Sequence, residues 1–375
     1  MKKLIQLIIL FISFAYSKGG IVSGFISDSS SGEALIGANV MIQETGQGMA
    51  TDINGYYIIQ NINPGSYTLM ASYVGFRVSR IQIIISDEES IKKDIEMVED
   101  LVQLTQVDVT AEKLQRRNNI QPSKINLSPR MMKAAPALAE PDLFRTIQAL
   151  PGVLTTSEYS TGLVIRGGNT DQNLIMLDGI TVYNPSHLGG VFSNFIVDGV
   201  KEAELIKGAY NAEYGGRLSA VLNVISREGN QKEFKGKANI SLLSAQTTLE
   251  GPFYKGAWIL SGRRTYFDLV LPKVLPDNIA TNIPPYFFYD VQGHIFSDIS
   301  SKDRFSLSYY TGIDDILFDT FGLDGRWGNN TISGHWRRVF SERLVGNFLV
   351  ANSNFRTMFG LGGDGGLVND NIIDD

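Results

Sequence analysis

The sequence contains no cysteine and only three histidines in its 375 residues. The absence of cysteine excludes disulfide bonds, zinc–thiolate sites and thiol catalysis. A net charge of −6 argues against a nucleic-acid-binding protein, which normally carries a basic patch. Beyond the N-terminus no apolar run reaches the ~18 residues of a membrane-spanning helix. If the mature protein lies in a membrane it must do so as a barrel, because only helices and closed barrels satisfy their backbone groups in lipid.

The first residues have the features of a secretory signal peptide. Lys2 and Lys3 give a basic start, and the stretch Leu4–Phe14 is apolar apart from Gln and Ser. Small residues lie at the −3 and −1 positions before Lys18, with Ser17 at −1. The alternative is an N-terminal membrane anchor, but the apolar stretch is too short to span a bilayer comfortably. We therefore predict a signal peptide over residues 1–17.

Residues 18–98 carry short β-patterns separated by turn residues, the strongest of which is Asn63-Pro64-Gly65. Regular spacing of this kind is typical of a small β-sandwich. The expected strands are Ile21–Ile26, Ala38–Gln43, Gly55–Ile59, Ser66–Val74 and Val78–Ile85, with turns at Asp28–Gly32 and at Gly46 and Gly48.

The stretch GYYIIQNINPGSYTLMASYVGF, residues 55–76, resembles the carboxypeptidase regulatory-like domain, a transthyretin-like sandwich. That name raises the hypothesis of a zinc peptidase, which needs histidine and glutamate in an HxxE or HExxH pattern. None of His187, His294 and His335 has a glutamate at that spacing. The sandwich is therefore expected to be an accessory module, and the sequence predicts no enzymatic activity, no metal site and no cofactor.

Residues 99–129 read as a polar connector that contains one short β-pattern. Val107 and Val109 alternate with polar residues inside the segment 104–111. A strand without a local partner has a free edge, which can add to the sheet of another protein. The alternative is that this segment forms one more strand of the adjoining domain, and the pattern alone leaves both open.

Residues 130–230 contain several motifs in a fixed order. PDLFRTIQALPGV, residues 141–153, predicts a helix that begins at proline and ends at Pro-Gly. LVIRGGNTDQNLIMLDGITV then predicts strand, glycine turn and strand, and VKEAELIKGAYNAEYGGRLSAVLNVISREG predicts strand, loop and strand. LPGV, IRGG, LDGI, KG and YGG in this order resemble the plug domain of TonB-dependent receptors. The last family motif, a GVINI-like strand, is mildly changed here to Ala220–Ile225.

This resemblance, with the sandwich module a pairing typical of Bacteroidetes-type receptors, implies roles for individual residues. The motif residues are Arg166, Gly167, Gly168, Asp178, Gly179, Tyr214, Gly215, Gly216 and Arg217. The glycine pairs permit backbone conformations closed to other residues. In the family, arginines at the positions of Arg166 and Arg217 bond acidic residues of the barrel wall. The alternative for both is a solvated or structural arginine.

The same resemblance gives the β-pattern in the connector a function. The segment takes the position of the TonB box, with residues Gln106, Val107, Asp108, Val109, Thr110 and Ala111. The resemblance implies that the periplasmic protein TonB captures this strand by β-addition. Force derived from the inner-membrane proton gradient then pulls on the plug, because the outer membrane holds no ATP and no gradient of its own.

Residues 231–375 predict the first strands of a transmembrane barrel. Phe305, Leu307 and Tyr309 alternate with serines, which is typical of strands with apolar residues outward and polar residues inward. Short connections are expected near 252–255, 300–303 and 341–342, and long ones near 266–285 and 313–328. Since a membrane strand takes about 9–11 residues, we divide 233–252 by a tight turn near Leu243–Ala245. That division gives seven strands and is expected to place every short turn on the periplasmic side.

The predicted fold is therefore mainly β. Its parts are a signal peptide (1–17), a transthyretin-like sandwich (18–98), a linker with the TonB box (99–129), a mixed α/β plug (130–230) and the start of an antiparallel barrel (231–375). Transporters of this type use about 22 strands around a plugged lumen. The sequence is thus expected to be the N-terminal part of a longer protein.

The predicted function is TonB-dependent active transport across the outer membrane, with the N-terminal domain in the periplasm. Expected partners are TonB, outer-membrane lipid, a surface lipoprotein, and a cargo that is a siderophore, vitamin, glycan or peptide; nucleic acid is not expected. The alternative is a secreted or surface β-rich adhesin or assembly protein that uses the same sandwich. Such a protein would need neither the plug motifs nor a TonB box.

Overall fold

The computed structural model describes residues 19–371 except for 53, 87–88, 101–123, 136–139, 158–159, 242, 275, 277–284, 301, 319–322, 342–343 and 362–369. The predicted signal peptide with its cleavage site at Ser17 and Lys18, and the predicted TonB box at 106–111, lie outside the described residues. The chain divides into two compact units, Met1–Asn119 and Ile120–Asp375. No helix in the described part is long and apolar enough to cross a membrane.

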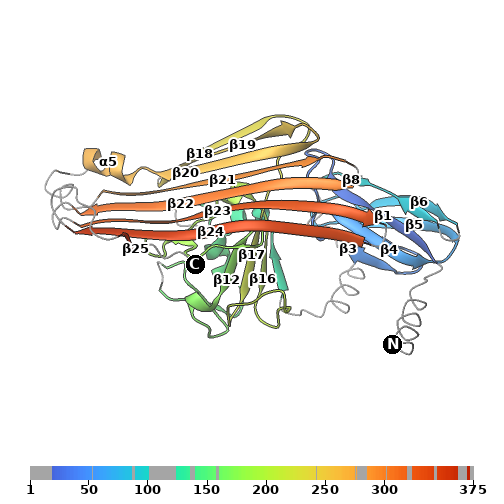
Figure 1. The fold of residues 1–375 in the computed structure, drawn as a ribbon, viewed down its shortest axis with the longest axis horizontal. Helices are drawn as coiled ribbons and strands as arrows, with labels where there is room; N and C mark the ends of the chain where they lie inside the picture. Colours follow the sequence, from blue (N-terminus) through green and yellow to red (C-terminus); the bar gives the residue numbers. More distant parts are fainter. Residues whose placement is uncertain are drawn as a thin grey trace, which may run out of the picture. The chain divides into compact units, whose positions relative to one another are not determined.

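The first unit is a β-sandwich, drawn in blue in Figure 1. Its core is formed by fully buried side chains from both sheets, among them Val22, Ile42 and Leu69. One sheet contains β4 (Tyr56–Ile62) and β1 (Gly20–Asp28), with β7 (Ser90–Lys92) and β8 (Ile95–Met97) both paired in parallel with β1. The other has the order β3 (Gly48–Ala50), β2 (Asn39–Ile42), β5 (Gly65–Ser72) and β6 (Ser79–Ile85).

The predicted sandwich is confirmed, with two differences in detail. Gly48, expected in a turn, begins β3, where it pairs with Met41. Strands β7 and β8 were not predicted, because three residues are too few to show a period of two.

The second unit begins with a mixed α/β module, which we call the central module (residues 124–226). Its main sheet has the order β13-β12-β17-β16-β9, with β12 and β17 parallel. The elements are β9 (Lys124–Leu127), α3 (Pro129–Ala134), α4 (Leu143–Gln148), β10 (Val153–Thr155), β11 (Leu163–Ile165), η2 (Thr170–Gln172), β12 (Leu174–Leu177), β13 (Ile180–Thr181), β14 (Ser186–His187), β15 (Phe192–Ser193), η3 (Val197–Gly199), β16 (Val200–Ile206) and β17 (Val221–Ser226).

Two boundaries of the central module differ from the prediction. The helix expected over 141–153 is only Leu143–Gln148, because Asp142 caps it by accepting hydrogen bonds from the backbone N–H groups of Phe144 and Arg145. Strand β9 lies inside the segment expected to be a linker. It belongs to the central sheet, because it pairs antiparallel with β16.

The rest of the second unit is one antiparallel sheet, which we call the wall sheet (residues 235–371) and which Figure 1 shows in yellow to red. Its strands follow one another in chain order, as in an up-and-down barrel. They are β18 (Lys235–Ile240), β19 (Ser244–Phe253), β20 (Gly256–Thr265), β21 (Tyr286–Asp298), β22 (Asp303–Phe318), β23 (Leu323–Ser341), β24 (Leu344–Leu361) and the short β25 (Asp370–Asn371), with α5 (Phe267–Val274) after β20.

The predicted alternation along the wall strands is confirmed. Phe305, Leu307 and Tyr309 are exposed on one face, whereas Tyr310 on the other face is buried. Near the short turns, Trp336 stacks on Phe305 and Phe348 on the exposed side. The wall sheet therefore has an apolar outer face and a polar face that contacts the central module.

Two expectations for the wall sheet are wrong. The segment 313–328 is mostly strand, because β22 and β23 stay paired from Ile313↔Gly328 to Phe318↔Leu323. The turn between β18 and β19 lies at the same end of the wall sheet as the long connection after β20, since the N–H of Tyr266, which begins that connection, donates to the carbonyl of Leu243. Not every short turn is therefore at one end. Helix α5, in the connection after β20, was not predicted either.

Candidate functional site

Five buried ionisable side chains join the central module to the wall sheet. The central module contributes Glu140 and His187, and the wall sheet contributes Arg263 from β20, Asp290 from β21 and Asp314 from β22. Their side chains are at most 3% exposed. We call these five residues the charge cluster. Charges buried to this extent need partners, because desolvation of an isolated ion costs several kcal/mol.

Arg263 is the centre of the charge cluster. Its Nε and Nη2 donate to Asp290 Oδ2 at 2.8 and 2.5 Å, and its Nη1 donates to Glu140 Oε1 at 2.8 Å. Nη2 also donates to the backbone carbonyl of Ser193 in the central module, at 2.6 Å. The planar guanidinium suits this arrangement, since its donors diverge in a fixed fork. One wall residue thus holds two segments of the central module.

Glu140 receives donors from the wall sheet on its other oxygen as well. Ser244 Oγ and Gln246 Nε2, both on β19, donate to Glu140 Oε2, the amide at 2.7 Å. The carboxylate is therefore fully paired although it is buried. Because every one of these donors belongs to the wall sheet, Glu140 acts as an anchor of the segment before α4.

His187 lies between the two wall carboxylates. Its Nε2 is 2.8 Å from Asp290 Oδ1, and its Nδ1 is 2.8 Å from Asp314 Oδ2. The ring also stacks on Phe288, with 4.1 Å between the ring centroids. Burial by itself lowers the pKa of His187, but the charges and hydrogen bonds of Asp290 and Asp314 outweigh it and raise the pKa above its ordinary value.

The hairpin β14–β15 places His187 at the wall. Leu188, Gly189 and Gly190 all have positive φ, and the N–H groups of Gly190 and Val191 donate to the carbonyl of His187. The tight turn directs the N–H of Leu188 to Asp314 Oδ1, at 3.0 Å, and to the hydroxyl of Tyr286. The hairpin therefore meets the wall sheet through both a side chain and the backbone.

Uncharged hydrogen bonds extend the contact across neighbouring wall strands. Asn329 on β23 accepts from the N–H of Tyr183 and donates to the carbonyl of Asn184 at 2.6 Å. Ser353 on β24 donates to the carbonyl of Thr181 at 2.7 Å. The central module is thus held along β19–β24.

The predicted motif residues mainly form turns of the central module. Arg166 and Gly167 both have positive φ and follow β11, and Asp178 and Gly179 form the same kind of two-residue turn between β12 and β13. Asp178 also accepts hydrogen bonds from the backbone and hydroxyl of Ser226 at 2.8 and 2.7 Å.

The remaining motif positions differ in whether and why the structure requires glycine. A Cβ at Gly168 would lie 2.3 Å from the hydroxyl of Ser219, so close packing excludes a side chain. Gly216 has φ of +76°, whereas Gly215 has neither a positive φ nor a close neighbour. Tyr214 packs beside Met176 and Ile206 in a small apolar cluster.

The two motif arginines do not meet the charge cluster. Arg217 donates to the carbonyl of Gly216 at 2.9 Å, and Arg166 is exposed. Among the residues that the structure describes, neither forms an ion pair with an acidic residue of the wall sheet. Their expected contact with barrel acids therefore stays a prediction, and the wall contact described here uses an arginine of the wall and a glutamate of the central module instead.

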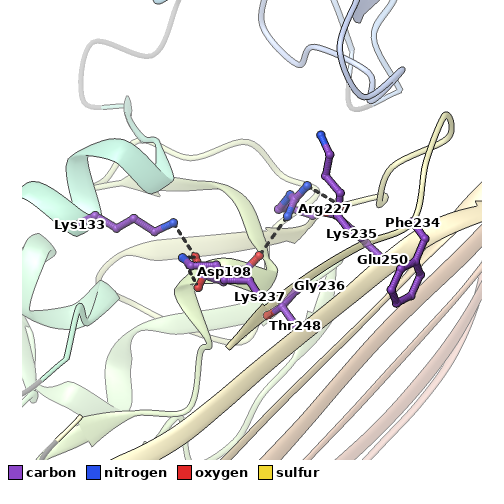
Figure 2. A pocket seen from close by; sticks show the side chains of 9 residues that line it. All are labelled: Lys133, Asp198, Arg227, Phe234, Lys235, Gly236, Lys237, Thr248 and Glu250. Carbon is purple, nitrogen blue, oxygen red and sulfur yellow. Dashed lines mark hydrogen bonds and ion pairs between the residues drawn. The ribbon is translucent and has the colours of Figure 1, made fainter. Parts of the chain in front are cut away.

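A second, more open contact lies at β18 and β19 beside a pocket with a volume of about 530 Å³. Figure 2 shows the side chains that line this pocket. Asp198 of the central module is 2.5 Å from Lys133 Nζ and 2.6 Å from Lys237 Nζ, and Arg227 pairs with Glu250 at 2.7 Å. Partial burial alone raises the pKa of Asp198, but Lys133 and Lys237 outweigh it and hold that pKa below its usual range. The lysine side chains are 42% and 55% exposed, so these pairs contribute little to stability.

The members of the charge cluster were not predicted as site residues. Arg263, Asp290 and Asp314 stand out only as charged residues within strands of alternating pattern, which places them on the inward face. Their partners in the central module lie 103 to 127 residues away in sequence, so no local spacing connects them. No group of His, Asp and Glu in the described part of the chain could hold a metal ion.

Comparison with known protein families gives two matches. Residues 22–109 match the family of the CarboxypepD_reg-like domain, and residues 127–221 match the family of the TonB-dependent receptor plug domain. The second match covers most of the central module, including all the motif residues named above.

Comparison with single proteins gives distant relatives. The chain is 28% identical over 233 residues to "TonB-dependent receptor P26" of Formosa agariphila, covering 58% of this chain and 22% of that protein. It is 23% identical over 241 residues to "TonB-dependent transporter Oar" of Myxococcus xanthus, covering 61% of this chain and 22% of that protein. The chain thus spans about a fifth of the length of these relatives. Among solved structures, the siderophore receptor PirA of Pseudomonas aeruginosa is similar with a TM-score of 0.47 and 16% identity, over 64% of this chain and 42% of that one.

Proposed function

We propose that this chain is part of a TonB-dependent receptor of the outer membrane and that its central module is the gate of an active transporter. The observation that supports the proposal most strongly is the docking of the matched plug domain on the inward face of the wall sheet. An accessory module attached to a barrel would not need a buried charge cluster at its contact with the wall. A plug that closes the pore needs such a cluster, because the plug must stay in place until it is moved.

We propose that TonB supplies the energy by capturing the segment Gln106–Ala111 as an added strand. This segment precedes β9, the first strand of the central module, so a pull on it reaches β9 next. Among the strands that the structure describes, β9 lies at the edge of its sheet and pairs with β16 alone. An edge strand is the part of a sheet that a pull along the chain detaches first, because it has a single hydrogen-bonded neighbour.

The proposed cargo is a scarce nutrient of the siderophore, vitamin, glycan or peptide class, delivered with or without a surface lipoprotein. The sandwich is proposed to be a periplasmic accessory domain. No enzymatic activity is proposed, since none of the three histidines has the spacing of a zinc peptidase. The adhesin alternative has no observation in its favour, since it leaves the match to the plug domain unexplained.

The test of the energy coupling is the variant Val107→Pro in the intact receptor. Proline lacks the N–H that a paired strand donates and fixes φ, so strand addition should fail. Binding of the purified periplasmic domain of TonB, measured by calorimetry, should weaken by at least about tenfold, or ~1.4 kcal/mol. The variant Asn118→Pro in the same connector is the matched control and should bind TonB normally. Normal binding to Val107→Pro would refute the assignment.

A further inference from the structure

The acceptors around His187 determine which charge state of the ring fits the charge cluster. Asp290 Oδ2 accepts two hydrogen bonds from Arg263, and Oδ1 accepts one from the hydroxyl of Tyr310 at 2.9 Å. Asp314 Oδ1 accepts from the N–H of Leu188 and from the hydroxyl of Tyr286. Each carboxylate is thus surrounded by donors, which is the environment of an ionised carboxylate.

A neutral imidazole cannot satisfy this arrangement. It carries one N–H, whereas both ring nitrogens of His187 lie 2.8 Å from carboxylate oxygens. Only the imidazolium donates from both nitrogens. A positive ring also stacks more favourably on Phe288, by the attraction between a cation and the face of an aromatic ring.

The ionisable groups around His187 come from every wall strand that meets the hairpin and from the central module. They are Arg263 on β20, Asp290 and Tyr286 on β21, and Asp314 and Tyr310 on β22, with Glu140 on the far side of Arg263 and Asp142 accepting a hydrogen bond from the N–H of Ser193 in the hairpin. With Asp290, Asp314 and Glu140 ionised, Arg263 alone leaves two negative charges unbalanced among these four residues. The imidazolium reduces that excess to one.

We propose that His187 is a proton-dependent positioning residue of the plug: as an imidazolium it holds the β14–β15 hairpin on wall strands β20–β22, and loss of its proton weakens that hold. The inference concerns the attachment of the plug rather than the uptake of cargo, and so it is tested without TonB or a ligand. The raised pKa of His187 agrees with it.

The sign of the pH dependence follows from this shift. A group whose pKa is raised in the docked state stabilises docking fully below its undocked pKa, about 6.5 for histidine, and loses that contribution as pH rises toward the docked value. The fraction of undocked hairpin should therefore increase by up to about tenfold for each pH unit above ~6.5. The loss begins near pH ~6.5 however high the docked pKa lies.

The first measurement is the protonation state of the ring in the intact receptor. Solid-state ¹⁵N spectra of histidine-labelled receptor should contain, at pH 7, one histidine with both ring nitrogens protonated. That signal should disappear in His187→Gln and persist in His294→Gln, whose ring in the natural receptor bonds to Ser308 within the wall sheet. A neutral imidazole spectrum for the signal lost in His187→Gln would overturn the proposal.

The second measurement is the exposure of the hairpin. Because the 375 residues contain no cysteine, Val191→Cys adds one thiol to this part of the receptor, in the partly buried turn beside Phe288, and its alkylation is followed on the peptide that contains residue 191. The alkylation rate is measured between pH 6 and pH 9 and divided by the rate in the combined variant Val191→Cys/His187→Gln. This division cancels the increase in rate that comes from ionisation of the thiol itself. The quotient should rise at least about tenfold over this range, as the natural hairpin loses its proton-dependent hold.

Two further outcomes decide the interpretation of the alkylation rates. In Asp314→Asn a neutral ring can donate to Asp290 alone, so the rise with pH should become smaller while the hairpin stays docked at pH 6. Parallel pH profiles with and without His187 would overturn the proposal, because a purely structural histidine affects the rate equally at every pH.

Discussion

At the scale of single residues, the contact between the central module and the wall sheet is reciprocal. The wall arginine holds Glu140 of the central module, and the wall aspartates hold His187. Neither side carries a complete set of partners, so separating the two leaves charges unpaired on both. Loss of one partner from a buried pair typically costs about 3–5 kcal/mol. The contact is therefore specific as well as strong.

Glu202, on β16, allows a residue-scale prediction about pH. Its side chain is 5% exposed, and Oε2 has no hydrogen-bond partner among the described residues. Burial, with a smaller effect of Glu204, raises the pKa of Glu202 from 4.5 to about 7. A raised pKa means that the central module has its full stability below pH ~4.3 and loses part of it as pH rises to about 7.

The variant Glu202→Gln should remove this loss. At pH 8 it should stabilise the central module by about 1–3 kcal/mol, seen as slower hydrogen exchange of amides in β16 and β17. At pH 4 the gain should vanish. Glu204→Gln is the matched comparison: Glu204 raises the pKa of Glu202 less than burial does and also pairs with Lys124, so its loss should stabilise the module less than Glu202→Gln does. Equal exchange in Glu202→Gln and the natural receptor at pH 8 would contradict the argument.

The conformations and contacts of single residues were predictable from the sequence only where the residues belong to a recognisable motif. In each of the two glycine pairs one member, Gly167 or Gly216, has the positive φ that the glycine motifs indicate. The charge cluster was missed, because its members come from five separate segments. They come into contact only when the wall strands pair in their register and the central module lies against them. Charged residues in β20–β22 indicate an inward face, but nothing in the sequence identifies their partners.

At the scale of elements, the turn between β12 and β13 allows a test of why glycine is required at a motif position, here Gly179. Gly179 has φ of +82°, and a Cβ added there would lie an ordinary 3.8 Å from its nearest neighbour, the side chain of Leu349. Gly179→Ala should therefore cost about 1 kcal/mol through backbone strain alone, measured by hydrogen exchange across β12. Gly215→Ala, at a position with open space and no positive φ, should have no effect. Equal effects of the two changes would exclude this explanation.

Elements were predictable where side-chain period and turn residues agreed. The alternation at Phe305–Tyr309 gave β22 its correct orientation, whereas the turn at Asp178-Gly179 between β12 and β13 was not predicted, because the segment was read as one strand. The segment 313–328 was misread, because its glycines and aspartates are turn residues by composition. They form strand here because β22 and β23 continue each other's hydrogen-bond ladder beyond the length needed to cross a bilayer.

At the scale of the whole molecule, the contacts of the central module are unequal around the wall. Buried ion pairs hold it at β20–β22, whereas the pairs at β18 and β19 are partly exposed and line a pocket. Exposed pairs contribute at most about 1 kcal/mol and weaken with salt. The proposed gate is therefore fixed on one sector of the wall and easier to move on another.

The first unit allows a prediction about the division of the molecule. All residues of its core cluster lie between Val22 and Met97, so the sandwich buries its apolar side chains without help from the rest of the chain. Residues 18–100 expressed alone should therefore fold, with a β-type circular dichroism spectrum and one cooperative unfolding transition.

A matched pair of variants makes this prediction specific to the observed core. Ala71 on β5 is 0% exposed, and Val74 just beyond the strand is 86% exposed. Ala71→Asp buries an unpaired charge and should abolish the transition, whereas Val74→Asp should shift the free energy of unfolding by no more than about 0.5 kcal/mol. If both variants unfold, or neither does, the core does not lie where the sandwich places it. A natural segment that stays unfolded would show instead that the sandwich depends on the second unit.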